Sequence, residues 1–147
     1  MESVLIVGSG QAGIALASEI RKLDPRRPIT LLGRDTHSFN RTEFVQALGP
    51  QQTPLTIKPL TDLAERLRID VVTGHTVQSI KPLDGSVVTD QGEFQADKLV
   101  LATGASPMLP TFSRELPGLV AAVTHAAVIN KLRARLANIK DLIIIGA

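Results

Sequence analysis

The segment VLIVGSGQAGIALASEI, residues 4 to 20, constrains the fold more than any other part of the chain. Val4 to Val7 predicts a buried strand of a parallel sheet, because it is a short, uninterrupted apolar run that ends at a glycine. Apolar residues then recur at helical spacing, Asp24-Pro25 ends that helix, and Ile29 to Leu32 predicts a second buried strand. A strand, a helix and a strand within about 30 residues form a βαβ unit, whose crossover we expect to be right-handed.

A glycine-rich loop joins the first strand to the helix. In a dinucleotide-binding turn the first glycine permits the tight turn, the second lets the backbone approach the pyrophosphate, and the third lets helix and strand pack closely. The helix dipole at such a turn favours an anionic group by roughly 0.3–1 kcal/mol. The residues predicted to hold a pyrophosphate are Gly8, Ser9, Gly10, Gln11, Ala12 and Gly13. The alternative interpretation is a structural strand–helix turn that holds no ligand.

An acidic residue follows the second strand, where dinucleotide-binding folds place the group that meets the adenosine ribose. Asp35 is the candidate, and the alternative is an ordinary loop or capping aspartate. The guanidinium of its neighbour Arg34 could lie over an adenine or bind a phosphate, or it could be a solvated surface arginine.

The rest of the chain predicts an α/β fold with an antiparallel insertion. Asp84-Gly85 is a strong hairpin signal, and Gln91-Gly92 turns the chain again, so a small antiparallel meander lies within a parallel fold. Residues 33 to 55 are polar and predict irregular chain around one short helix. The other predicted elements are helices at 43–48 and 60–67, strands at 71–72, 76–80, 87–89 and 99–102, and a last helix that Thr124 caps.

Composition excludes several classes of function. The 147 residues fit one domain, with 44% apolar and 20% charged residues and no apolar run near the ~20 residues that span a membrane. No basic leader precedes the first apolar run, so the expected location is the cytoplasm. The formal charge is only +2, the basic residues are scattered, and there is no Tyr or Trp to stack on bases, which argues against nucleic acid as a partner. The chain has no cysteine, which excludes disulfides and thiolate metal sites within it.

The segment DKLVLATGASP, residues 97 to 107, adds a second motif to the N-terminal loop, and an apolar strand restarts at Asp141. Together these resemble the FAD-dependent pyridine nucleotide–disulfide reductase family, flavoproteins with two dinucleotide-binding domains. The resemblance implies that residues 1–140 are a Rossmann-like FAD-binding domain, and that residues 141–147 are the first strand of an NAD(P)-binding domain in a longer protein. It also implies that Ala102, Thr103 and Gly104 pass the cofactor from its other side, and that the backbone around Val77 meets the adenine ring.

The stretch ITLLGRDTHSFNR, residues 29 to 41, resembles the rubredoxin and flavorubredoxin reductases and the ferredoxin reductases of that family. The resemblance implies that Arg41 lies beside the flavin, although Thr42 departs from the proline that commonly follows; the alternative is a plain surface arginine. Disulfide reductases of this fold carry a reactive cysteine soon after the second strand, and residues 34–52 contain none. An external electron acceptor is therefore favoured, although a dithiol in the rest of a longer protein stays open.

The function that the resemblance implies is electron transfer from NAD(P)H through FAD to a small iron protein of the rubredoxin or ferredoxin type. The isolated chain is expected to lack that turnover. Two alternatives stay open: an NAD(P)-binding Rossmann module without FAD, and a non-catalytic scaffold fragment. His37, His75 and His125 have no metal-ligand spacing and are interpreted as surface or packing residues, and the basic helix face at Lys131, Arg133 and Arg135 is a solvated surface or a dock for an acidic partner.

Overall fold

The computed structural model describes residues 1–49, 53–116 and 118–145. The chain divides into two compact units. The sheet unit comprises Met1–Phe39 and Ile57–Ala105, and the helical unit comprises Asn40–Thr56 and Ser106–Ala147.

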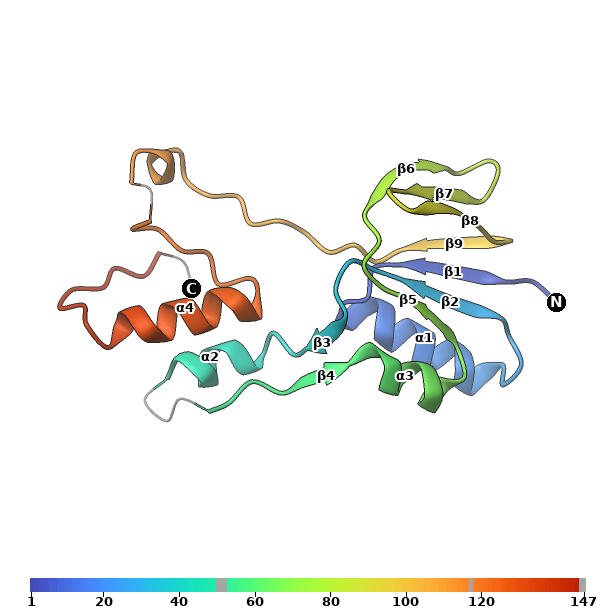
Figure 1. Ribbon diagram of the computed structural model, residues 1–147, viewed down its shortest axis with the longest axis horizontal. Coiled ribbons are helices and arrows are strands. Elements are labelled where there is room, and N and C mark those ends of the chain that lie inside the picture. Colours follow the sequence, from blue (N-terminus) through green and yellow to red (C-terminus); the bar gives the residue numbers. More distant parts are fainter. Residues whose placement is uncertain (50–52, 117, 146–147) are drawn as a thin grey trace. The chain divides into compact units, whose positions relative to one another are not determined.

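The sheet unit is built on a four-stranded parallel sheet with the strand order β5-β2-β1-β9 (Figure 1). Its central strand, β1 (Val4–Val7), pairs in parallel with β2 (Ile29–Leu32) and with β9 (Lys98–Leu101). The edge strand β5 (Asp70–Val72) pairs with β2. The predicted parallel α/β fold is thus confirmed.

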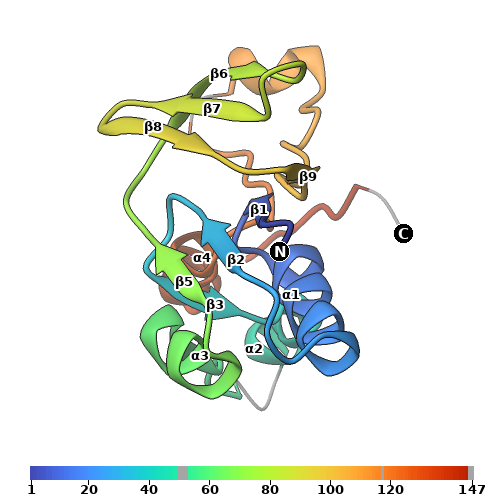
Figure 2. The ribbon, with the colours of Figure 1, turned by 90° about the vertical axis from the view of Figure 1, so that its right-hand side faces the viewer.

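Two helices cover one face of this sheet, and a second sheet covers the other (Figure 2). α1 (Gln11–Leu23) connects β1 to β2, and α3 (Leu60–Leu67) precedes β5. Successive side chains of a strand point to opposite faces, so a strand covered on both sides must be apolar throughout. This is the physical reason for the uninterrupted apolar run of β1, all four residues of which are buried.

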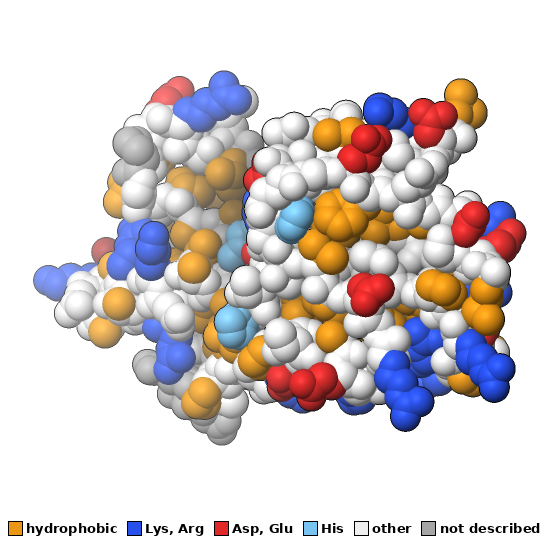
Figure 3. All heavy atoms as spheres, turned by 45° about the vertical axis from the view of Figure 1, so that its right-hand side comes forward, with side chains coloured by type: hydrophobic (Ala, Val, Ile, Leu, Met, Phe, Trp, Pro, Cys, Tyr) orange, Lys and Arg blue, Asp and Glu red, His pale blue; other side chains and the backbone are white. Residues whose placement is uncertain are grey.

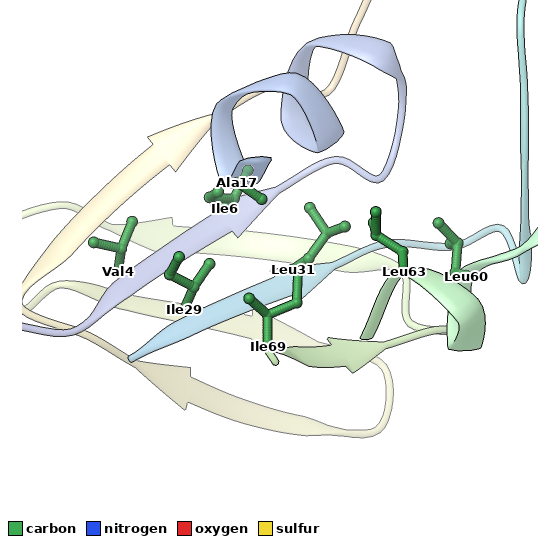
Figure 4. Close-up of a cluster of buried hydrophobic side chains, with 8 residues drawn as sticks. All are labelled: Val4, Ile6, Ala17, Ile29, Leu31, Leu60, Leu63 and Ile69. Carbon is green, nitrogen blue, oxygen red and sulfur yellow. The ribbon is translucent and has the colours of Figure 1, made fainter. Parts of the chain in front are cut away.

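Each face of the parallel sheet has its own core. The core on the helix side joins side chains from β1, β2, α1, α3 and the residue that precedes β5 (Figure 4): Val4, Ile6, Ala17, Ile29, Leu31, Leu60, Leu63 and Ile69. The core on the other side joins Leu5, Val7 and Leu32 to Val87 of the second sheet. Full burial of each such Leu, Ile or Val side chain stabilises the fold by about 1.5–3 kcal/mol.

The second sheet is the predicted antiparallel meander, with the order β6-β7-β8. Its strands are β6 (Val77–Lys81), β7 (Ser86–Thr89) and β8 (Gly92–Gln95). Gly85 takes a φ of 63° in the turn between β6 and β7, which a residue with a side chain rarely adopts, so the Asp84-Gly85 hairpin signal is confirmed.

A short antiparallel pair was not predicted. β3 (His37–Phe39) pairs with β4 (Ile57–Pro59), with His37 opposite Pro59 and Phe39 opposite Ile57. Each strand has only three residues, and none of them is fully buried. Three residues are too few for a polar–apolar alternation to reveal a strand in the sequence.

The helical unit contains α2 (Glu43–Leu48), the 3₁₀ turn η1 (Thr111–Arg114) and α4 (Ala126–Leu136). α2 packs against α4, and Phe44 and Ile129 are buried. The predicted cap at Thr124 is wrong, because the N-cap residue of α4 is His125 and no side-chain hydrogen bond closes that cap.

The described part of the C-terminal segment, residues 141–145, forms no strand, and its four apolar side chains are exposed. Gly146 and Ala147, which belong to the same predicted strand, lie outside the described residues. That this segment begins a further domain stays a prediction. Within the described part of the chain, no helix is both long enough and apolar enough to cross a bilayer.

A polar clasp joins the beginnings of β1 and β9. The Ser3 amide and hydroxyl each donate to one oxygen of Asp97 at 2.7 Å, and the Asp97 amide donates to the Ser3 hydroxyl at 3.1 Å. The hydrogen bond from the Ser3 backbone amide, followed by that from the Ser3 hydroxyl, lowers the pKa of the Asp97 carboxyl below its ordinary value of 3.8.

We expect Asp97→Asn to lower the free energy of unfolding at neutral pH. A carboxyl whose pKa is lower in the folded state stabilises the fold above the unfolded-state value and loses that contribution as the pH falls through the folded-state value. The wild-type chain is therefore expected to lose stability below about pH 4 more steeply than the variant does. Urea unfolding between pH 2.5 and 7 measures the stability of both proteins against pH. Parallel curves would show that Asp97 does not cause the loss of stability at low pH.

Candidate functional site

Four connecting segments meet at the carboxyl edge of the parallel sheet. They follow β1 at Gly8, β2 at Gly33, β5 at Thr73 and β9 at Ala102. The chain leaves β1 toward β2 on one side, whereas β9 lies on the other side of β1, so the strand order reverses there. Open α/β sheets bind their ligands at such a switch point. The edge between β1 and β9 is accordingly the candidate site.

Gly8 lies where two backbone segments nearly touch. Its amide donates to the Leu32 carbonyl at 2.7 Å, and the Ala102 amide donates to the Val7 carbonyl at 2.7 Å. A Cβ at Gly8 would collide with the Ala102 carbonyl and lie 2.9 Å from the Thr103 nitrogen. Gly8 also has a φ of 118°. The first glycine is thus required by both its conformation and the lack of space beside β9.

Gly13 allows close packing of helix on strand, whereas Gly10 borders open space. A Cβ at Gly13 would collide with the Gly8 carbonyl, so this glycine lets α1 pack directly on the end of β1. A Cβ at Gly10 would meet no atom within 4 Å, and its φ of −78° suits any residue. The backbone at Gly10 is therefore open to a ligand rather than packed against the protein.

The first turn of α1 has no side-chain cap. Gly10 is the N-cap residue, no side-chain hydrogen bond closes this cap, and there is no acidic residue in the first turn. The first N–H groups of a helix have no carbonyl partner within the helix, and the helix dipole is positive there. The space beside Gly10 therefore suits an anionic group.

Gly33 was missed by the sequence interpretation. A Cβ at Gly33 would collide with the Ser9 hydroxyl and lie 2.7 Å from the Ser9 Cβ. Ser9 is itself buried, so it supports the loop from beneath while it packs on the end of β2. The available signal was a glycine directly after an apolar strand, which often marks a close backbone approach.

Arg34 and Asp35 follow Gly33 at the same edge, and both are exposed. Arg34 Nε and Asp35 Oδ1 are 4.0 Å apart, which makes a weak ion pair in water. The Gly74 amide donates to the Arg34 carbonyl at 3.2 Å, so the segment after β5 runs beside these two residues. The side chain of Val77 is partly buried and packs against the core that contains Leu5.

The remaining predicted site residues are exposed. Thr103 and Gly104 are exposed beyond the end of β9, and Gly104 has a φ of 73°. Arg41 is exposed in the helical unit, so its role beside a flavin stays a prediction. Among the described residues, no group of three or more His, Cys, Asp or Glu side chains could hold a metal ion.

A surface pocket of about 430 Å³ lies at the opposite, amino-terminal edge of the sheet, where α1 and α3 end. Its arginines hold the structure together: Arg21 donates to the Leu67 and Arg68 carbonyls at 2.7 and 2.9 Å, and Arg27 pairs with Asp24 at 2.9 Å. The pocket is therefore a junction between helices, and the glycine-rich edge stays the candidate site. On the face shown in Figure 3, basic and acidic side chains are interspersed.

A parallel sheet with a glycine-rich turn at its switch point is typical of dinucleotide-binding α/β proteins. The model of the pyridine nucleotide-disulphide oxidoreductase family matches residues 2–147, and the chain belongs to that family. The family resemblance drawn from the sequence is thus confirmed.

Curated relatives carry names from the predicted branch. The chain is 37% identical to the nitric oxide reductase FlRd-NAD(+) reductase of Aeromonas hydrophila over 118 residues, which are 78% of this chain and 29% of the relative. It is 31% identical to the rubredoxin-NAD(+) reductase of Alcanivorax borkumensis over an alignment 149 residues long, which covers 99% of this chain and 39% of the relative. The chain thus spans about a third of the length of these relatives.

Solved structures share the fold. The NAD-dependent persulfide reductase of A. fulgidus superposes with a TM-score of 0.80 at 26% identity, over 92% of this chain and 27% of that one. The NADH:rubredoxin oxidoreductase of Clostridium acetobutylicum has a TM-score of 0.69 at 21% identity, over 93% of this chain and 36% of that one. At 21% identity, the likeness to the second structure shows a shared fold alone.

We expect Gly8→Ala to destabilise the sheet unit strongly, and Gly10→Ala to change it little. Alanine at position 8 combines a positive φ with a collision against backbone, which costs at least about 2 kcal/mol. Alanine at position 10 meets open space and gives up only the glycine preference of an N-cap, at most about 1 kcal/mol. Urea unfolding of the two variants tests this contrast, and equal stabilities would contradict the packing described for Gly8.

Proposed function

We propose that this chain is the FAD-binding portion of an NAD(P)H-dependent flavoprotein reductase that passes electrons to a small iron protein. The observation that carries the proposal is the open backbone at Gly10, beside the uncapped first turn of α1 and at the switch point of the sheet. Membership of the family and the names of the relatives support FAD and NAD(P)H as the nucleotides. When bound, the flavin supplies hydride acceptance from NAD(P)H and the release of single electrons.

In this proposal the glycine loop and the segment after β9 hold the cofactor between them. Backbone N–H groups of the first turn of α1 donate to the pyrophosphate, and Gly10 provides the space for its approach. The Asp35 carboxylate accepts hydrogen bonds from the adenosine ribose, with Arg34 beside the adenine or a phosphate and the backbone around Val77 beside the ring. Ala102, Thr103 and Gly104 pass the other side of the cofactor, and Arg41 is assigned to the flavin edge, where a cation favours the anionic reduced form.

An iron protein is the proposed electron acceptor because of the relatives and the composition. The relatives' names contain rubredoxin and FlRd. This chain has no cysteine, so it supplies no thiol to carry electrons onward. On α4, Lys131 and Arg135 are exposed and lie one turn apart, whereas Arg133 lies on the other side of the helix. Lys131 and Arg135 are suited to an acidic partner, since charge complementarity raises the rate of encounter.

We expect Gly10→Val to weaken FAD binding by about 10- to 100-fold, because its side chain would occupy the space of the pyrophosphate and deny it hydrogen bonds from the helix start. Quenching of FAD fluorescence measures the affinity, and circular dichroism checks the fold. Ala15→Val, at an exposed position of the same helix, is the matched control and is expected to bind like wild type.

The same titration separates the alternatives. Binding of NADH with none of FAD would favour an NAD(P)-binding module. Failure of wild type to bind either nucleotide would favour a scaffold. Equal FAD affinity of Gly10→Val and wild type would refute the proposed pyrophosphate site at Gly10.

We expect Asp35→Asn to weaken binding of ADP and FAD by about tenfold, because a charged acceptor strengthens a hydrogen bond by roughly 1.4 kcal/mol over a neutral one. Asp62→Asn, at an exposed position of α3, serves as the control for loss of one negative charge. Isothermal titration with ADP measures both variants. An unchanged affinity of Asp35→Asn would remove this residue from the site.

A further inference from the structure

The end of β5 and the segment between β5 and β6 hold the loop that carries Arg34 and Asp35. The Gly33 amide donates to the Val72 carbonyl at 2.9 Å, and the His75 amide donates to the Gly33 carbonyl at 3.3 Å. The Gly74 amide donates to the Arg34 carbonyl at 3.2 Å. The path of the loop after β2 is therefore set by backbone hydrogen bonds to this segment.

The ring of His75 is held by the antiparallel sheet. Its Nδ1 lies 3.0 Å from the Thr89 hydroxyl oxygen. That hydroxyl donates its hydrogen to the Gly92 carbonyl at 2.9 Å, and it accepts from the Gln91 amide at 3.2 Å. A hydroxyl has one hydrogen to donate, so when that hydrogen goes to the Gly92 carbonyl, the oxygen is an acceptor toward His75 and Nδ1 carries the ring hydrogen. Thr89 is only 5% exposed, so water competes little for this bond.

Two further contacts fix the same ring and segment. The His75 and Phe94 rings meet edge to face, with centroids 5.3 Å apart and an interplanar angle of 79°. Phe94 packs in turn against the core that contains Leu5 and Val87. The Gln91 side-chain amide donates to the Gly74 carbonyl at 2.6 Å. His75 thus connects the loop after β2, through its backbone, to the antiparallel sheet, through its ring.

We propose that His75 is a positioning residue for the adenosine end of the nucleotide site, held by Thr89 as the Nδ1–H tautomer. The inference rests on the proposed nucleotide site, because it concerns the loop that carries Asp35. A side chain that recognises a ribose must be held within about 0.5 Å of its binding position. The side chains of Arg34 and Asp35 are exposed, so packing of these side chains does not hold the backbone that carries them. The ring contacts of His75 with Thr89 and Phe94, which we call the His75 clamp, supply that support from the antiparallel sheet.

The clamp can be weakened without dismantling the antiparallel sheet. The Thr76 amide donates to the Asp90 carboxylate at 2.9 Å, and the Asp90 amide donates to the Thr76 carbonyl at 3.1 Å. These bonds and the β6–β7 pairing do not involve the His75 ring.

Two pairs of variants test the proposal in the 147-residue chain. Thr89→Val removes the acceptor and keeps the shape, whereas Thr89→Ser keeps the hydroxyl. His75→Gln carries its amide donor at the place of Nε2, whereas His75→Asn carries it at the place of Nδ1. Circular dichroism and thermal melting check the fold of each variant.

We expect Thr89→Val and His75→Gln to bind ADP and FAD about tenfold more weakly than wild type, and Thr89→Ser and His75→Asn to stay within about threefold, as for the loss or retention of one hydrogen bond. Binding of inorganic pyrophosphate, which lacks the adenosine, is expected to be the same in all five proteins. Imidazole ¹⁵N chemical shifts are expected to report hydrogen on Nδ1 of His75 in wild type and in Thr89→Ser, and a shift of that hydrogen toward Nε2 in Thr89→Val. If Thr89→Val fails to fold, the His75 pair and the wild-type spectrum decide the question.

Each failure has a distinct signature. Wild-type chain that binds neither ADP nor FAD would refute the proposed function, and the positioning role with it. Wild-type chain that binds both nucleotides, with all folded variants equal to it, would refute only the role of His75. A wild-type spectrum with the hydrogen on Nε2 would refute the clamp whatever the affinities.

Discussion

The sheet unit depends on three stretches of backbone that meet at Gly8 without side chains between them. The end of β9 lies against the α-carbon of Gly8, and the start of α1 lies against its carbonyl through Gly13. Any Cβ at either glycine would meet backbone, which has no flexible end that could move aside. This contact sets the positions of β1, α1 and β9 together, and so shapes the edge at which the strand order reverses.

The candidate site is formed mainly of backbone and borders a two-sided core. Leu5 and Val7 point to one face of the sheet, and Val4 and Ile6 point to the other, so the strand before the glycine loop is held from both sides. A parallel sheet that is covered on both faces has little freedom to shift a strand by one residue, because that would exchange its two apolar sets. The position of the candidate site is therefore held by packing rather than by charged side chains at the site.

Local sequence patterns predicted the elements whose signals lie within a few residues of one another. The β1–α1–β2 unit, the meander and its Asp84-Gly85 turn each depend on a period or on turn chemistry that a short window contains. The β3–β4 pair escaped prediction because its strands are short, mostly exposed and separated along the chain by α2. The Thr124 cap was wrong because a favourable residue type does not determine at which residue a helix begins.

The sequence by itself determined the fold class, the family and the glycine positions of the candidate site, because spacing along one chain segment sets these features. Only the tertiary structure decided that Gly33 must be small, since the atom that excludes a side chain there belongs to Ser9, in a loop remote in sequence. It also placed the His75 ring beside the Thr89 hydroxyl, which itself lies within hydrogen-bond distance of the Gly92 carbonyl. Contacts between distant segments carry no period along the chain, so they become visible only when the chain is folded.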